Sequence, residues 1–171
     1  TTKTEPEVLE AMLPYFTEQY GNPSAIYSFA SHNKGVVAEQ RERIATALGA
    51  KSNEIYFTAG GSESDNWALK ATAEVYQNKG KHIITTAIEH HAVLETIDYL
   101  VQHFGFEATI IQPENQEITA QQIQEALRED TILVSTMFAN NETGNLLPIA
   151  EIGQILKQHP AAYHVDAVQA I

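Results

Sequence analysis

The stretch that decides the fold is HIITTAIEHHAVLETIDYLVQHFGFEATIIQ, residues 82–112. It opens with an apolar run over 82–87 that is rich in β-branched residues, as buried strands are. Residues 91–104 are expected to form a helix that ends at Gly105, because glycine commonly follows the last helical turn. A second strand is expected over 107–112. Strand, helix and strand of these lengths predict a β-α-β unit with parallel strands.

The same alternation continues on both sides of this unit. The other expected elements are strands over 54–58, 131–138 and 162–166, helices over about 34–48, 62–78, 119–128 and 148–158, and a helix over 7–19 that is interrupted at Pro14. The fold class expected is therefore α/β, a mainly parallel sheet flanked by helices. We expect a short N-terminal helical and loop segment over about 1–34 and an α/β core over about 35–171.

Composition limits the classes of function. The chain has 171 residues, 43% of them hydrophobic, which suits one globular domain or part of one. Its formal charge of −12 disfavours nucleic acid and anionic membrane surfaces as partners. It contains no cysteine, so no disulfide and no thiol chemistry comes from these residues. There is no apolar run of about 20 residues and no signal-peptide pattern at the start, and we expect a cytoplasmic protein.

Polar residues gather just after the expected strands. They are Gly60-Gly61-Ser62, Glu89-His90-His91, Asn140-Asn141-Glu142-Thr143-Gly144, and Asp166 with Gln169. Each group alone is ordinary, since it could be a capped turn, a solvated histidine or a loop. In open parallel sheets, however, ligands bind beyond the carboxyl ends of the strands. The joint placement therefore favours a binding site at that edge.

The run TAGGSESDN, residues 58–66, predicts a phosphate cradle. Ser62 is expected to cap a helix, with Asp65 three residues later completing a capping box. The first N–H groups of a helix have no internal partner and lie at the positive end of its dipole, which suits an anion. The run is neither a Walker loop nor the dinucleotide-binding G-x-G-x-x-G pattern.

Pyridoxal 5'-phosphate (PLP) is a ligand that needs this whole set of groups. Its phosphate suits a helix N-terminus and its flat ring a stacking partner. Its pyridine nitrogen needs a carboxylate that keeps it protonated, and its phenolic oxygen needs donors such as Asn or Gln.

With these motifs, the chain resembles the class V aminotransferase superfamily and, within it, the cysteine desulfurases of the NifS/IscS type. The stretches that carry the resemblance follow the family's order along almost the whole chain and are 1–4, 6–15, 20–24, 57–66, 89–94, 140–144 and 164–169. The resemblance implies the large PLP-binding domain of a fold-type I transferase. It also implies a homodimer that takes sulfur from L-cysteine, releases L-alanine, and passes the sulfur through an enzyme persulfide to an acceptor protein, for iron–sulfur clusters or related products.

The resemblance further implies a role for each site residue. Gly61 and Ser62 would hold the phosphate, and Asn141 would contact the phenolic oxygen side and the substrate. His90 would stack on the ring and exchange protons, as an imidazole can near neutral pH. Asp166 would pair with the pyridine nitrogen and Gln169 with the phenolic oxygen. No metal site is expected, because His90 and His91 are adjacent and no ligand spacing is present.

Three parts of such an enzyme are missing from the sequence. The Schiff-base lysine would lie after Asp166, beyond Ile171, and the persulfide cysteine and the small C-terminal domain are also absent. The large domain is therefore expected to be incomplete and the 171 residues alone to be inactive. Thr1-Thr2 matches the tail of an early family segment, so the chain is also expected to begin late.

Two alternatives stay open at this point. One is another class V enzyme that depends on PLP, an aminotransferase or a selenocysteine lyase. The other is a non-catalytic protein that kept the fold, and titration with PLP would separate it from the enzymes.

Overall fold

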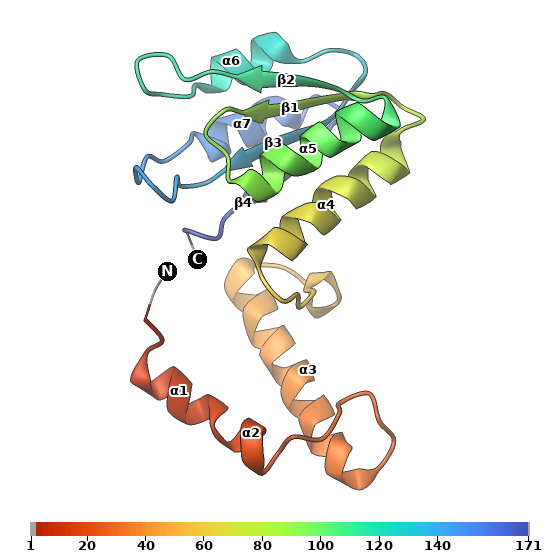
Figure 1. The fold of residues 1–171 in the computed structure, drawn as a ribbon, viewed down its shortest axis with the longest axis vertical. Helices are drawn as coiled ribbons and strands as arrows, with labels where there is room; N and C mark the ends of the chain where they lie inside the picture. Colours follow the sequence, from red (N-terminus) through yellow and green to blue (C-terminus); the bar gives the residue numbers. More distant parts are fainter. Residues whose placement is uncertain (1–2, 171) are drawn as a thin grey trace. The chain divides into compact units, whose positions relative to one another are not determined.

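The computed structural model describes residues 3–170. The chain divides into two compact units, Thr1–Phe57 and Thr58–Ile171, which are described separately (Figure 1). Thr1 and Thr2, which begin the first matching motif, and Ile171, where the sequence stops, lie outside the described residues.

The first unit is helical. It contains α1 (Pro6–Met12), α2 (Pro14–Thr17), α3 (Ser28–Leu48) and a short 3-10 helix, η1 (Ser52–Glu54). Pro14 begins α2, so the predicted interruption is confirmed. Gly49 ends α3 in the left-handed conformation, at φ 67°, as predicted for a residue after the last turn. The helix begins at Ser28, however, six residues before the predicted start.

The strand predicted over 54–58 is wrong. Residues 52–54 form η1, and no strand covers residues 55–58. The Arg41 guanidinium donates to the backbone oxygen of Ile55 and lies 4.7 Å from the centre of the Phe57 ring, so α3 holds this segment. The β-branched and aromatic residues favour an extended backbone, but a strand also needs a hydrogen-bonded neighbour.

The second unit contains a four-stranded parallel sheet in the order β2-β1-β3-β4 (Figure 1). Its strands are β1 (His82–Thr86), β2 (Glu107–Ile111), β3 (Thr131–Met137) and β4 (Ala162–Asp166), within two residues of the predicted bounds. In the register, Ile83 pairs with both Ala108 and Leu133. The predicted fold class is confirmed.

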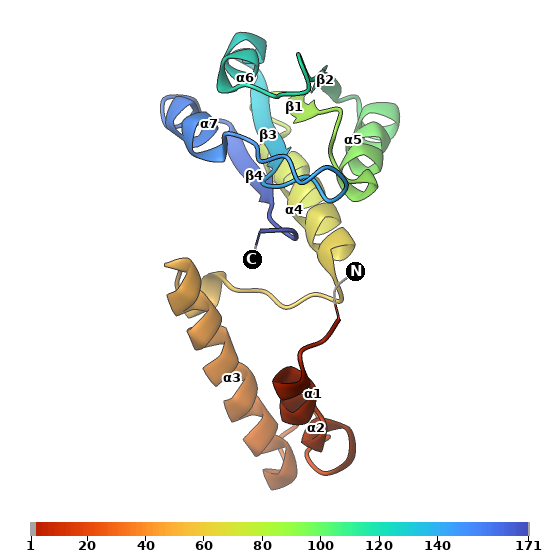
Figure 2. The same cartoon turned by 90° about the vertical axis from the view of Figure 1, so that its left-hand side faces the viewer.

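Helices cover both faces of this sheet: α4 (Gly61–Tyr76), α5 (His91–Phe104), α6 (Ala120–Ala126) and α7 (Ile149–Leu156). Figure 2 shows α4 and α5 on one face and α6 and α7 on the other. Neighbouring residues of β1 divide between the two layers, since Ile83 joins the core under α4 and α5 and Ile84 the core under α6 and α7. No helix within residues 3–170 combines the length and apolar character that a membrane crossing needs.

The strand order creates a switch point between β1 and β3. From β1 the chain passes through α5 to β2 on one side, whereas from β3 it passes through α7 to β4 on the other side. Successive connections therefore leave β1 and β3 in opposite directions, and ligands of open α/β sheets bind beyond the carboxyl ends of two such strands. Most of the sequence motifs lie at the strand ends of this edge.

Gly80 marks a close approach between the segments that precede β1 and β3. A Cβ atom at this position would lie 2.1 Å from the backbone oxygen of Asp130. Because backbone atoms cannot rotate away, we expect Gly80→Ala to lower the free energy of unfolding by about 2 kcal/mol or more. Urea unfolding measures this. Gly35→Ala, in the interior of α3 with open space around its Cβ, is the control and should be neutral or stabilising.

Candidate functional site

The N-cap of α4 lies earlier in the sequence than predicted. The helix begins at Gly61, its N-cap is Gly60, and Ser62 is an exposed residue of the first turn. The predicted Ser62 cap and its capping box with Asp65 are therefore wrong. Glu63 occupies the third helical position instead, and its carboxylate accepts a 2.6 Å hydrogen bond from the N–H of Ala59.

The first turn of α4 presents free donors. Within residues 3–170, no hydrogen bond is recorded for the N–H groups of Gly61, Ser62 and Glu63. Thr58 fixes the preceding loop, because its hydroxyl lies 2.7 Å from Ser64 Oγ and donates to the backbone oxygen of Gly60 at 3.1 Å. A helix start with three unpaired N–H groups is suited to an anion.

Gly61 also links this turn to the end of β4. A Cβ at Gly61 would lie 2.7 Å from Cγ2 of Val168, so the two segments are in close contact. Val168 lies between Asp166 and Gln169 in the sequence. The structure therefore brings the predicted phosphate cradle next to the predicted partners of the pyridine nitrogen and the phenolic oxygen.

His90 follows β1 and caps α5. Its Nδ1 accepts a 3.1 Å hydrogen bond from the N–H of Ala92, which leaves Nε2 as the protonated nitrogen of a neutral ring. The side chain is exposed, and the ring of His91 meets it edge-on at 6.3 Å between centroids. The hydrogen bond holds the imidazole of His90 beyond the end of β1, with Nε2 facing away from this contact.

Glu89 is a buried residue to which sequence reasoning gave no role. Its Oε1 accepts from the hydroxyl of Thr86 at 2.6 Å and from the N–H of Met137 at 3.0 Å, while Oε2 is buried with no hydrogen-bond partner among the described residues. The carboxyl group thus ties the end of β1 to the end of β3 across the switch point. Burial raises the pKa of Glu89 to about 7, and the nearby charge of Asp166 acts in the same direction.

The two asparagines after β3 have different surroundings. Asn140 donates to the backbone oxygen of Ile88 at 2.9 Å and accepts from the N–H groups of Glu142 and Thr143, so it builds the turn. Asn141 is exposed, and within residues 3–170 no hydrogen bond is recorded for its side chain. The structure therefore leaves Asn141, the predicted site residue, free for a ligand.

Asp166 ends β4 as a buried carboxylate, 8% exposed. Its Oδ1 accepts a 3.1 Å hydrogen bond from the N–H of Val168, whereas no partner is recorded for Oδ2 within the described residues. Gln169 lies in the turn that follows and is exposed. One oxygen of Asp166 is thus held by the backbone and the other is free to accept a proton donor.

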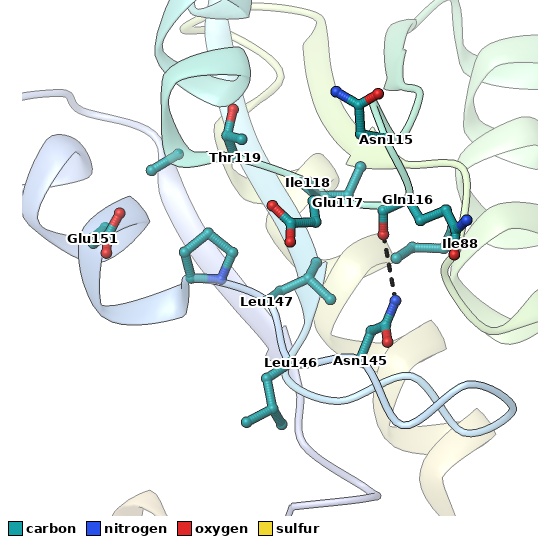
Figure 3. Close-up of a pocket in the computed structure, with 12 residues that line it drawn as sticks. Ile88, Asn115, Gln116, Glu117, Ile118, Thr119, Asn145, Leu146, Leu147 and Glu151 are labelled. Atoms are coloured by element: carbon teal, nitrogen blue, oxygen red, sulfur yellow. Dashed lines mark hydrogen bonds between the residues drawn. The ribbon is translucent and has the colours of Figure 1, made fainter.

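A separate cavity of about 740 Å³ lies in the second unit, lined by the loops that precede α6 and α7 (Figure 3). Asn145 bridges these loops by donating to the backbone oxygen of Gln116 at 3.3 Å. None of the predicted site residues lines this cavity. The candidate site is therefore the group of residues at the strand ends and not this cavity.

The chain is similar to named proteins and to solved structures. The chain is 53% identical over 173 residues to cysteine desulfurase IscS of Clostridium botulinum, covering 100% of this chain and 43% of the relative. A solved structure described as a NifS-like protein superposes with a TM-score of 0.95 at 38% identity, over 100% of this chain and 47% of that one. SspA in complex with cysteine matches with a TM-score of 0.94 at 38% identity, over 99% of this chain and 49% of that one.

The chain spans less than half the length of these relatives. The model of the family described as aminotransferase class-V matches residues 1–171, the whole of the sequence. Together with the parallel sheet and the polar residues at its strand ends, this match shows that the chain belongs to the class V aminotransferase family.

Proposed function

We propose that this chain is the PLP-binding part of a cysteine desulfurase, an enzyme that converts L-cysteine to L-alanine and transfers the sulfur atom to a cysteine thiol as a persulfide. The observation that carries the proposal is the convergence of four segments at one sheet edge. A helix start with free N–H groups, an exposed imidazole, an unpaired carboxamide and a buried carboxylate all lie there. The similarity to proteins named cysteine desulfurase supports the substrate.

The residues present fit PLP at both ends. The phosphate would be held by the N–H groups at the start of α4, with Gly61 and the hydroxyl of Ser62 nearest to it. Asp166 would accept a hydrogen bond from the protonated pyridine nitrogen on its free Oδ2, while the N–H of Val168 holds Oδ1 in place. A buried carboxylate with one oxygen fixed is suited to keep that proton on the ring.

The exposed side chains at the strand ends suit the ring and the phenolic oxygen of PLP. His90 would lie against the ring, with Nε2 able to hold or release a proton during the reaction. Asn141 would contact the phenolic oxygen side and the substrate, and Gln169 would hydrogen-bond the phenolic oxygen. When bound, the cofactor supplies an electron sink for bonds at the α-carbon of the amino acid.

The overall reaction is balanced without a further reagent. The C–S bond of L-cysteine breaks and a proton replaces sulfur to give L-alanine, while the sulfur atom forms an S–S bond with an acceptor thiol. The chain has no cysteine, so in this proposal the thiol and the lysine that carries PLP come from the rest of a longer protein. We also propose that this protein is a cytoplasmic homodimer that hands sulfur to an acceptor protein.

The proposal is tested on the full-length protein that contains this chain. PLP is removed and titrated back by absorbance, and alanine and sulfide are then measured with L-cysteine as substrate and a dithiol that reduces the persulfide to thiol and sulfide. Release of both products at equal rates is expected. PLP binding without release of either product would favour another class V enzyme, and no PLP binding would favour a non-catalytic protein.

Gly61→Ala is expected to weaken PLP binding by about tenfold, because the added methyl group meets Val168 and shifts the first turn of α4. The dissociation constant measured by absorbance titration checks this. Val168→Ala removes the atom that the methyl group meets, so the double variant should recover most of the affinity. If the double variant binds as weakly as Gly61→Ala, the contact with Val168 is not the cause.

A further inference from the structure

The buried stripe of α4 contains one charged residue. Asp65, Leu69 and Ala73 recur every four residues along the helix and are its buried positions. Leu69 and Ala73 join the apolar core under α4 and α5. Asp65, one turn after the start of the helix, faces β4 through a polar contact instead.

This contact is part of a network that joins three elements. Oδ1 of Asp65 lies 3.5 Å from Nε2 of His164 on β4, and Nδ1 of His164 lies 2.9 Å from Oγ of Ser135 on β3. The side chain of Asp65 is 6% exposed, that of His164 16%, and Ser135 is fully buried. The buried serine is not accessible to a substrate, so the arrangement is not a nucleophilic triad.

The network lies between the two ends of the proposed cofactor site. Asp65 is four residues after Gly61 on one helix, and His164 is two residues before Asp166 on one strand, so His164 and Asp166 share a face of the sheet. Glu89 lies near the same strand ends, because it accepts from the N–H of Met137, which pairs across the sheet with Asp166 as Ser135 does with His164. Any shift of α4 along β4 would change the separation of the phosphate cradle from Asp166.

Apolar contacts alone do not fix such a shift, because they have little directional preference. Leu69 and Ala73 hold α4 against the sheet but would tolerate a small slide of the helix. A buried carboxylate beside an imidazole prefers a defined separation, and loss of the imidazole would leave the carboxylate of Asp65 buried without this polar neighbour. Asp65 and His164 are therefore suited to set the position of the helix along the strand.

We propose that Asp65 and His164, supported by Ser135, are positioning residues that set the distance between the start of α4 and Asp166, and thereby the fit of PLP. The inference rests on the proposed cofactor site. The phosphate of PLP is joined to its ring by only a short CH2–O link, so a site that holds the phosphate and the pyridine nitrogen must keep its two ends within a narrow range of separation. The pair acts through the helix and the strand and touches no reacting atom.

The experiment uses the full-length protein with PLP removed. Asp65→Ala, His164→Ala and the double variant are compared with wild type by absorbance titration with PLP, visible circular dichroism of the bound cofactor and melting temperature of the apo form. Each single variant is expected to raise the dissociation constant by about tenfold and to change the circular dichroism band. The double variant should bind PLP no more weakly than either single variant, since the two residues act as one unit.

Leu69→Ala is the matched control, because Leu69 lies one turn further along the same face of α4. It should lower the melting temperature by creating a cavity while leaving the dissociation constant within about twofold of wild type. Equal loss of PLP affinity in Leu69→Ala would overturn the proposal in favour of general destabilisation. A dissociation constant unchanged in both single variants, or losses that multiply in the double variant, would overturn it as well.

Asp65→Asn serves if the alanine variants do not fold, since it keeps the shape of the side chain and removes its charge. It must then show the same loss of affinity, and an unchanged dissociation constant would sink the proposal. The wild-type protein separates this failure from failure of the function itself. If wild type binds PLP and the variants bind equally well, only the positioning role is lost, whereas no binding by wild type refutes the cofactor site.

Discussion

Under the proposed function, replacing Asp166 by alanine is expected to abolish turnover of L-cysteine by the full-length protein, with a loss at least on the order of 100-fold. The carboxylate is 8% exposed at the end of β4 and has one oxygen free of partners within the described residues. In the proposed site it holds the proton of the pyridine nitrogen. Without that negative charge the proton is lost to solvent, and the electron sink that the reaction needs is weakened.

Alanine and sulfide release under saturating PLP measure this loss, and the absorbance spectrum shows whether PLP is still bound. Asp166→Asn separates charge from shape, because its amide oxygen can still accept from the N–H of Val168. We expect it to lose activity nearly as fully as the alanine variant. Asp98→Ala, an exposed aspartate on α5, is the control and should keep wild-type activity. Near-normal turnover in Asp166→Ala would refute the assigned role.

The sheet of the second unit could be predicted because its signals are local. Each strand is a short apolar run next to a helical pattern, and capping residues mark several ends. Thr119 and Gln122, for example, form the capping box that begins α6. The segment 54–58 has the same local character and yet forms no strand, because pairing depends on a neighbouring strand that the sequence pattern does not show.

The positions of the site residues were also predictable in outline. His90, Asn141, Asp166 and Gln169 lie at or after the ends of strands, which the parallel sheet brings to one edge. Gly61 and Ser62 follow no strand, and their segment approaches this edge at Val168. The finer roles were not predictable, since they depend on contacts between distant residues. Asp65 was expected to serve as part of a helix cap, but the helix begins one residue earlier and Asp65 turns inward to meet His164, 99 positions later in the sequence.

Glu89 shows the same limit for an ionisable group. In the sequence it is an ordinary acidic residue beside two histidines. In the fold it is buried, and it accepts a hydrogen bond from the N–H of Met137, which is 48 positions away in the sequence. The visible signal was its place directly after a strand, which it shares with His90. Only the fold shows that these two neighbours differ, because Glu89 is buried at the strand ends and His90 is exposed.

The protonation of Glu89 is expected to make the free energy of unfolding fall as pH rises from 4.5 to about 7. Burial raises the pKa of the folded carboxyl to about 7 from an ordinary value of 4.5. Between these values the folded protein keeps the proton and the unfolded chain has lost it, so folding binds a proton and is favoured at the lower pH. At 1.36 kcal/mol per pH unit, the interval corresponds to about 3 kcal/mol at most.

Glu89→Gln removes this dependence while keeping the link between β1 and β3. Its amide oxygen can still accept from Thr86 and Met137, and no charge is buried at high pH. The free energy of unfolding of the apo protein is measured with urea at pH 5 and pH 8. From pH 5 to pH 8, this free energy should rise in Glu89→Gln relative to wild type by up to about 3 kcal/mol. Glu95→Gln, at an exposed position on α5, is the control, and its free energy of unfolding should change with pH as that of wild type does. If Glu89→Gln does the same, the carboxyl group is charged in the folded protein throughout this range, and the neutral link across the switch point is wrong.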